Sequence, residues 1–87
     1  MAGMNVEVCR AQAEILETQA QKIKTVKTTI DGLVEELKQN WWGQDARDFA
    51  GKWEGTHKPE LQKVQTKLKN VVQTIRTEAK EQVNASR

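Results

Sequence analysis

Two long stretches of the chain place apolar residues at the spacing of an amphipathic helix. Over residues 6–40 the apolar positions recur in steps of three and four. The members of this first stripe are Cys9, Ala13, Leu16, Ala20, Ile23, Ile30, Val34, Leu37 and Trp41. Lys27 is the one polar residue on the stripe, and Val26 and Leu33 widen it to one side. The pattern predicts a helix over about residues 6–40, roughly 50 Å long.

A second stripe begins soon after the first ends and is nearly as long. Its members are Ala46, Phe49, Ala50, Trp53, His57, Leu61, Val64, Leu68, Val71, Val72, Ile75, Ala79 and Val83. It predicts a helix over about residues 45–84, with His57 on the interior side as a structural histidine. Pro59 lacks a backbone donor and its ring clashes with the preceding turn, so a kink or short break is expected there. A bent but continuous helix is favoured over one that restarts with Thr56 as N-cap, because the stripe resumes in nearly the same phase.

The segment between the stripes has the features of a tight connection. Asn40 is a poor helix former, Gly43 can adopt the positive φ that ends a helix, and Asp45 is a candidate N-cap for the next helix. Two long helices joined by a turn at residues 41–44 fold back antiparallel with their stripes facing. The predicted fold class is therefore all-α: a single domain over residues 1–87, built as an antiparallel helical hairpin.

One hairpin leaves part of each stripe uncovered. A chain of 87 residues builds only a marginal core, and its sole cysteine, Cys9, cannot form an internal disulfide. Cys9 is expected to be a buried small hydrophobe, with an intermolecular disulfide as the alternative. The uncovered strip predicts that the hairpin dimerises into a four-helix bundle. The residues expected in the core or the dimer interface are Leu16, Ile23, Ile30, Leu37, Leu61, Val64, Leu68, Val71 and Ile75.

The charged residues are typical of solvated surfaces. The 14 basic and 12 acidic residues leave a net charge of +2, well short of the basic excess expected of a nucleic-acid binder. The second half, residues 44–87, has nine basic and six acidic residues and so a charge of about +3. A solvated face is the default interpretation, and attraction to an acidic sister subunit or to an anionic membrane are the alternatives.

Other function classes lack their residues. No nucleophile–base pair, phosphate-cradling glycine loop or carboxylate dyad is visible, so the chain is not predicted to be an enzyme. No Cys/His set has metal-ligand spacing, and no cofactor is predicted. No stretch approaches 18 apolar residues, and Glu7, Arg10 and Glu14 stand where a signal peptide would need an apolar run.

All the aromatic residues lie within residues 41–53. They are Trp41, Trp42, Phe49 and Trp53. Trp53 lies on the second stripe and is expected in the core or the dimer interface. Trp41 either only closes the hairpin or also takes part in recognition. Trp42 either caps the hairpin tip or belongs to an exposed binding patch.

The midpoint of the chain resembles a known family. Trp41-x-Gly43 is followed by Gly43-x-x-Ala46-x-x-Phe49, with Trp53 one turn beyond. This arrangement is similar to that of the WXG family of small helical hairpins, the ESAT-like substrates of the type VII (ESX) secretion system. The resemblance covers nearly the whole chain, from the length and the leaderless start to the central motif.

The resemblance implies both a partner and a destination. It implies a homodimer, or a heterodimer with a sister protein, that leaves the cell folded through the ESX machinery as substrate, escort or effector binding module. The protein would be secreted without a cleavable signal peptide after synthesis in the cytoplasm. Trp41, Trp42 and Gly43 would form the recognised turn, supported by Ala46, Phe49 and Trp53. The alternative function is an intracellular coiled-coil adaptor that pairs with another helical protein.

One family feature is missing. Family members carry Tyr-x-x-x-Asp/Glu in the C-terminal helix, which together with the Trp-x-Gly turn of the other subunit forms the export signal. This chain has no tyrosine, and Gln82 with Ser86, or a neighbouring pair, occupies the corresponding region. The absence favours a heterodimer in which a partner supplies the motif, while a homodimer stays open.

Overall fold

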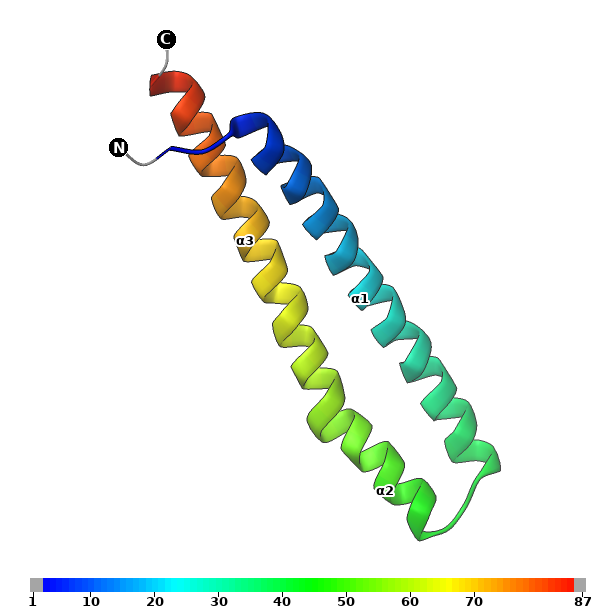
Figure 1. Cartoon of the computed structure of the whole chain (residues 1–87). Helices are drawn as coiled ribbons and strands as arrows, with labels where there is room; N and C mark the ends of the chain where they lie inside the picture. Colours follow the sequence, from blue (N-terminus) through cyan, green and yellow to red (C-terminus); the bar gives the residue numbers. More distant parts are fainter. Residues whose placement is uncertain (1–2, 86–87) are drawn as a thin grey trace.

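The structure is a computed structural model that describes residues 3–85. Four helical segments follow one another: α1 (Val6–Asn40), α2 (Gln44–Lys52), the π-helical turn η1 (Trp53–His57) and α3 (Lys58–Ala85). The last three are contiguous and form one long rod beside α1 (Figure 1). The all-α class and the helical hairpin are thus confirmed, and no strand occurs within residues 3–85.

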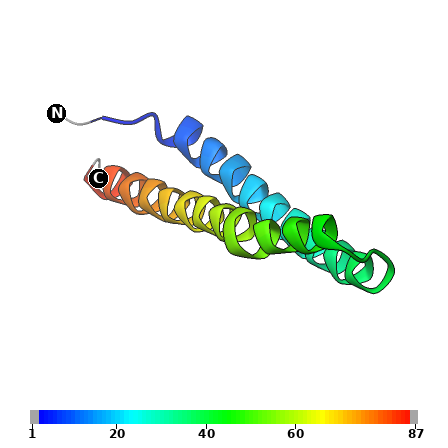
Figure 2. The same cartoon turned by 90° about the horizontal axis from the view of Figure 1, so that it is seen from below.

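The two rods run antiparallel, so the start of α1 and the end of α3 lie near each other and the turn lies at the far end (Figure 1). Seen from below, the rods cross at a shallow angle (Figure 2). The molecule measures 65 × 18 × 13 Å and has a radius of gyration of 19.2 Å. A compact domain of this length would have a radius of gyration of about 12 Å. The hairpin therefore exposes much more surface than a globular domain of the same mass.

Both ends of α1 have identifiable causes. The side-chain oxygen of Asn5 accepts a hydrogen bond from the backbone N–H of Val8 at 3.1 Å, and Glu7 in the first turn complements the positive end of the helix dipole. At the other end Trp41 is extended, with φ −134° and ψ 117°, and its N–H donates to the Leu37 carbonyl. The helix therefore ends at Asn40, and both central tryptophans lie in the link.

Gly43 makes the turn possible. Its φ of 112° and ψ of −176° fall in a region that is essentially restricted to glycine, and it is the one positive-φ residue within residues 3–85. The positive φ predicted for Gly43 is confirmed. The prediction of Asp45 as N-cap is wrong, because Gly43 is the N-cap of α2 and its carbonyl accepts from the N–H of Arg47. Asp45 lies in the first helical turn, where a carboxylate complements the dipole.

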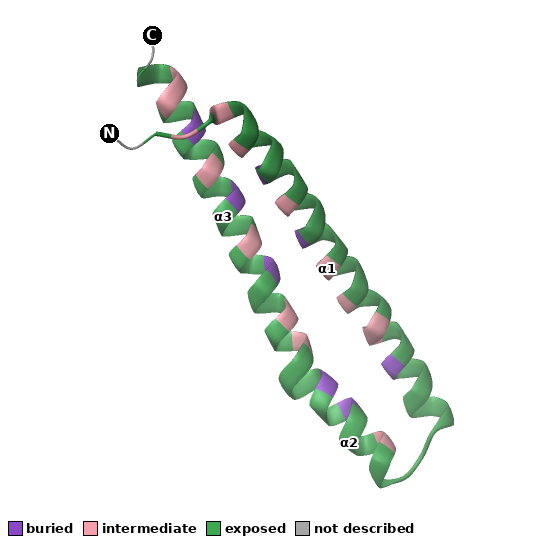
Figure 3. Cartoon of the chain, in the orientation of Figure 1, coloured by how far each residue is buried: buried purple, intermediate pink, exposed green. Residues whose placement is uncertain are grey.

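The seam between the rods is narrow and lined by small residues. Buried positions follow the inner sides of both rods (Figure 3). The buried apolar residues are Ala13, Ala20, Val34, Ala50, Trp53, Val72 and Ala79. Half-buried between them lie Leu16, Ile23, Ile30, Leu61, Leu68 and Ile75. Four of these seven buried apolar residues are alanine, which allows close approach of the helices but buries little apolar area. Cys9 is half-buried rather than buried.

The inner row of α3 differs from the predicted stripe at one polar position. Gln65 is only 4% exposed, and its side-chain oxygen accepts from the ammonium of Lys27 at 3.2 Å. Lys27 also donates to Gln62, so the polar residue on the α1 stripe is matched by two amides across the seam. Val64 and Val71 are 48% and 42% exposed and lie beside the seam. The observed inner row is Leu61, Gln65, Leu68, Val72, Ile75 and Ala79.

The helix passes Pro59 by changing its type. In η1 the N–H of Lys58 donates to the carbonyl of Trp53, five residues earlier, which is the π-helical spacing. The wide turn lies immediately before the Pro59 ring, and no residue there leaves the helix. A restart capped by Thr56 is therefore wrong, since Thr56 lies inside η1. The extra residue of the π turn also rotates His57 out of the seam; it is exposed, and its predicted interior position is wrong.

Candidate functional site

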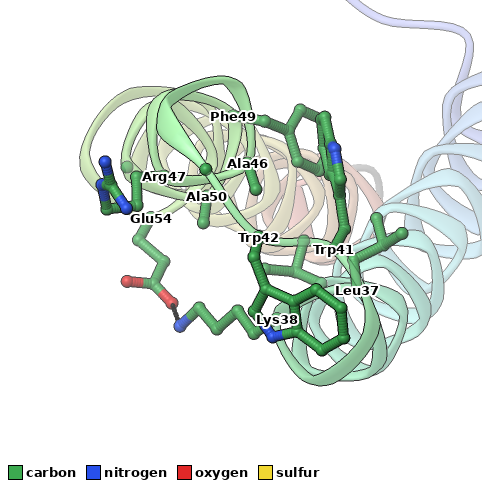
Figure 4. A pocket seen from close by; sticks show the side chains of 12 residues that line it. Leu37, Lys38, Trp41, Trp42, Ala46, Arg47, Phe49, Ala50 and Glu54 are labelled. Atoms are coloured by element: carbon green, nitrogen blue, oxygen red, sulfur yellow. Dashed lines mark hydrogen bonds and ion pairs between the residues drawn. The ribbon is translucent and has the colours of Figure 1, made fainter.

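The turn end of the hairpin holds a cavity of about 420 Å³, here named the tip pocket. Its lining residues are Val34, Leu37, Lys38, Trp41, Trp42, Gly43, Ala46, Arg47, Phe49, Ala50, Gly51 and Glu54. The volume is within the range of small-molecule and side-chain binding sites. Two aromatic rings lie on one side of the pocket and three charged side chains on the other (Figure 4).

The aromatic side joins the link to α2. The ring centroids of Trp41 and Phe49 are 6.2 Å apart and their planes are tilted by 46°, a favourable separation for an aromatic pair. Trp41 is 40% exposed and Phe49 is 45% exposed. The pair therefore closes the turn and also leaves large parts of both rings in solvent.

The charged side contains a neutralised lysine. The ammonium of Lys38 lies 2.7 Å from a carboxylate oxygen of Glu54 and 3.3 Å from one of Glu35. The hydrogen bond to Glu54, followed by that to Glu35, raises the pKa of Lys38 above its ordinary value. This ion pair ties the end of α1 to η1 beside the pocket.

Arg47 occupies a different electrostatic setting. Its guanidinium donates to the side-chain oxygen of Gln44 at 3.1 Å, which is a neutral partner. The residues three and four positions away on α2 and the link are Gly43, Gln44, Ala50 and Gly51, none of them charged. Arg47 therefore presents a positive charge at the pocket that its helical neighbours do not offset.

Trp42 is the most exposed large apolar side chain among residues 3–85, at 78%. It lies at the mouth of the tip pocket, below the cavity in Figure 4. Of the two alternatives for Trp42, this exposure favours membership of an exposed binding patch over a role as a cap that seals the hairpin tip. An indole left in water at the mouth of an apolar cavity is suited to contact with another molecule.

Trp53 and Asp31 fix the start of the long α3 rod against α1. The indole N–H of Trp53, which is 5% exposed, donates to one carboxylate oxygen of Asp31 at 2.8 Å. The ammonium of Lys58 lies 2.8 Å from the other oxygen. The hydrogen bond from Lys58, followed by that from Trp53, holds the pKa of Asp31 below its ordinary value. Trp53 is the first residue of η1 and Lys58 directly follows its last residue, so Asp31 contacts both ends of the π turn.

One long face of the hairpin carries the polar contacts between the rods and is named the polar face. Arg76 pairs with Glu17 at 2.6 Å near the chain ends. The other cross-rod contacts, in order toward the turn, are Lys27 with Gln62, Lys58 with Asp31, and Lys38 with Glu54. These contacts place a partner beside each of the charges involved.

The opposite face of α1 is apolar. Val8, Ile15, Val26 and Leu33 are separated by 7 or 11 residues, intervals that return a helix of about 100° per residue to nearly the same direction. All four are between 49% and 52% exposed. Leu33 lies about 160° around the helix from Asp31, on the side away from the ion pairs.

The rod that faces α1 continues this apolar surface. Val71 points about 140° away from Arg76 on α3 and so lies on the side opposite the ion pairs. Phe49 lies opposite the Lys38–Glu54 pair (Figure 4). The members of this surface, named the apolar face, are Val8, Ile15, Val26, Leu33, Leu37, Trp41, Phe49, Val64 and Val71.

The structure places the predicted site residues in three different parts of the hairpin. Trp41, Trp42 and Gly43 meet at the tip pocket together with Ala46 and Phe49, whereas Trp53 lies in the core. Of the residues expected in the core or the dimer interface, Leu37, Val64 and Val71 lie on the apolar face, and the other six lie half-buried in the seam. Gln82 is half-buried near the end of α3, and Ser86 lies outside the described residues.

Sequence reasoning missed three charged participants in the site. The sequence predicts a solvated surface for its charged residues by default, and this includes Arg47, Lys38 and Asp31, because nothing in the local sequence shows what faces them across the hairpin. For Arg47 a signal was present: the uncharged residues three and four positions away predict an unpaired cation. For Lys38 and Asp31 the partners Glu54 and Lys58 lie on the other rod.

Two other features are absent from residues 3–85. No group of three or more His, Cys, Asp and Glu side chains is placed to hold a metal ion. None of the helices there combines the length and the apolar character needed to cross a membrane.

Comparison with known proteins gives one match. Residues 3–84 match the family model WXG100, described as proteins of 100 residues with WXG. No curated protein matches the chain, and no solved structure matches it. The family consists of small helical proteins and is associated with substrates of type VII secretion. Because the match covers nearly the whole hairpin, including the turn and both rods, the chain belongs to the WXG100 family.

Proposed function

We propose that the chain pairs through its apolar face with a second hairpin, and that a type VII (ESX) secretion system exports the folded pair. The pair would be a four-helix bundle. In this role the protein is a substrate, escort or effector binding module and not an enzyme. The observation that carries the proposal is an uncovered apolar face in a chain of this family.

The total surface supports pairing. The chain exposes 6661 Å², whereas a folded monomer of 9.9 kDa is expected to expose about 5,200 Å². The excess of this one chain, roughly 1,500 Å², is more than the approximately 800 Å² that each partner buries in a standard protein–protein interface. A second hairpin would remove surface that the single hairpin cannot cover.

The apolar face is large enough to be the interface. Its nine side chains are each 40% to 52% exposed, which corresponds to on the order of 700 Å² of apolar surface. Monomeric soluble proteins rarely exceed about 300–600 Å² in one apolar patch, and each partner in a standard interface buries about 800 Å². The charged residues that form the cross-rod contacts of the polar face already have partners within the chain. This face therefore offers a second hairpin less surface for pairing than the apolar face does.

The tip pocket supports recognition by the export machinery. Trp41 and Gly43 form it together with Phe49, at the end of the hairpin farthest from the chain ends. A second hairpin placed on the apolar face would cover the aromatic side of the pocket and leave the side with Arg47 open. Export and pairing would then use adjoining but separable surfaces.

The intracellular adaptor is the second candidate, favoured by the same apolar face. An adaptor needs the interface but not the tip. The adaptor function predicts that changes in the tip pocket leave function intact as long as pairing survives. Export through recognition of the turn predicts that such changes abolish function even when pairing survives.

Export from the producing bacterium, with its own type VII system intact or deleted, tests the proposal. Wild type is expected in the medium only when the system is present. Trp42→Ala is expected to reduce export by about tenfold or more while the light-scattering mass of the pair is kept, because Trp42 lines the tip pocket but lies outside the apolar face and removal of a recognition anchor of this kind costs on the order of 2 kcal/mol. Thr28→Lys, on the exposed surface of α1 away from the tip, is the control. Equal export of Trp42→Ala and wild type, or retention of wild type in the cell, would contradict the proposal.

A further inference from the structure

We propose that the tip pocket binds a segment of another protein that places an apolar side chain against Trp42 and a carboxylate on the guanidinium of Arg47. The inference rests on the proposed function, because it names the chemistry that the exposed part of the tip would recognise. It concerns two residues, one between the tryptophan and glycine of the motif and one in α2.

The charge balance of the pocket identifies Arg47 as the charged group of the lining that is not paired with an opposite charge of the lining. Three charged side chains line the cavity: Lys38, Arg47 and Glu54. Lys38 and Glu54 neutralise each other at 2.7 Å. Arg47 therefore supplies the net positive charge of the lining, and its guanidinium donates a hydrogen bond to the neutral Gln44. A carboxylate is the group that matches the planar, forked guanidinium best.

The guanidinium is also held in position. The amide of Gln44 donates to a carboxylate oxygen of Asp48 at 2.6 Å, which turns its carbonyl oxygen toward Arg47. Asp48 thus acts on Arg47 through Gln44. One nitrogen of the guanidinium is engaged by Gln44, and the remaining donors are available to a bidentate carboxylate. Gln44 is a positioning residue in this arrangement.

The apolar half of the ligand follows from the rest of the lining. Ala46, Ala50 and Gly51 are small and leave room for a side chain in the cavity of about 420 Å³. Trp42, 78% exposed, offers an indole surface at the mouth. A bulky apolar side chain could cover that indole while a neighbouring carboxylate reaches Arg47.

The position of Arg47 favours a separate protein over a second copy of the chain as the occupant. Arg47 and the Lys38–Glu54 pair lie across the pocket from Trp41 and Phe49 (Figure 4). A hairpin that covers the apolar face lies on the side of the two rings and not on the side of Arg47. The charged side of the pocket therefore stays accessible in the pair.

The test is a selection of short random peptides, displayed on beads, against the full-length chain. Three proteins are compared: wild type, Arg47→Glu, and Lys52→Glu as the matched control. Lys52 is an exposed base on the same helix that does not line the pocket. Wild type and the control are expected to enrich peptides with an apolar and an acidic residue, and Arg47→Glu to enrich peptides with a basic residue instead.

Titration of the indole signals of the protein with an enriched peptide measures the strength of the contact. Loss of the peptide carboxylate by Glu→Gln, or of the guanidinium by Arg47→Gln, is expected to weaken binding by on the order of tenfold, as for a hydrogen bond between charged groups. Trp42→Ala is expected to weaken it as well. The Lys52→Gln variant should bind like wild type.

Three results would overturn the inference. They are the absence of any enriched peptide, the same enriched peptides for wild type and Arg47→Glu, and a loss of paired mass in Arg47→Glu, which would show that a second copy occupies the pocket. If wild type pairs and is exported but shows no preference for acidic peptides, this inference alone fails. If wild type neither pairs nor is exported, the proposed function fails whatever the peptides show.

Discussion

The two long faces of the hairpin differ in what their side chains contact, although the same two rods form both. On the polar face, Glu17, Lys27, Asp31 and Lys38 of α1 each contact a residue of the other rod. On the apolar face, about half of each side chain is exposed, and the aromatic pair of Trp41 and Phe49 is itself 40% to 45% exposed. The polar face fixes how the rods lie against each other, and the apolar face leaves apolar surface available for contact with another molecule.

This difference shows how a single hairpin can be well defined while it leaves apolar surface exposed. The seam is narrow because small residues such as Ala13 and Ala20 line it, so burial between the rods contributes little per residue. Trp53, with its bond to Asp31, is the large exception. Exposed ion pairs add modest stability but specify register. We infer that the seam and the polar face determine the hairpin, and that the apolar face provides the stability of the assembly.

The largest effect is expected from the residue that links the seam to the polar face. Trp53→Ala removes the largest buried side chain among residues 3–85, and should lower the free energy of unfolding by about 3–5 kcal/mol. Urea unfolding followed by far-UV circular dichroism measures it. Trp42→Ala, the control at an exposed tryptophan, should change the value by less than about 0.5 kcal/mol. Similar losses for both variants would contradict the burial assigned here.

Trp53→Phe separates packing from hydrogen bonding and keeps the test usable if the alanine variant does not fold. It preserves much of the buried ring but removes the N–H that Asp31 accepts. Its stability should lie between those of wild type and Trp53→Ala. A value equal to that of Trp53→Ala would show that the indole N–H, and not the buried ring, is responsible for the effect.

The hairpin itself could be predicted from sequence because it depends on local patterns. The three-and-four stripe on α1 and the glycine at position 43 are enough to predict a helix, a turn with positive φ and a second helix. Cross-rod relations were not accessible in this way. Gln65 is buried because Lys27 on the other rod donates to it, and no property of the residues near Gln65 signals that partner.

The second feature that could not be predicted from the sequence was the helical phase of the rod around Pro59. The stripe from Trp53 to Leu61 fits a regular helix if His57 is counted as interior, yet the π turn adds a residue and turns His57 outward. Proline predicts a disturbance but not how the backbone accommodates it. The tip was predictable in its residues and not in its charge pattern, since Lys38 is neutralised by Glu54 of the other rod while Arg47 is not.

A change on the apolar face should break the assembly and spare the hairpin. Leu33→Lys replaces a side chain that is 52% exposed, so the monomer should keep its helix content. Pairing should weaken by about a hundredfold or more, or roughly 2.7 kcal/mol, because a charge would be buried in the interface. Light scattering should then give the mass of one chain, 9.9 kDa.

Thr28→Lys is the matched control for that change. It adds the same charge to the same helix, at an exposed position about 140° around from Leu33. Its pairing should equal that of wild type. Loss of pairing in both variants would point to net charge rather than to the apolar face, and pairing kept in Leu33→Lys would place the interface elsewhere.

The smallest expected effect concerns the polar face and depends on pH. Lys58 and Trp53 hold the pKa of Asp31 below its ordinary value, so the ionised form binds protons less readily in the folded than in the unfolded chain. The stability it provides is present above about pH 4 and is lost as the pH falls through the lowered folded value. Asp31→Asn keeps an oxygen for Trp53 but removes the charge, so it should melt below wild type at pH 7 and like wild type near pH 2. Glu36→Gln, an exposed carboxyl on the same helix, controls for general charge loss. A difference between Asp31→Asn and wild type that is the same at both pH values would show that the charge on Asp31 does not hold η1 against α1.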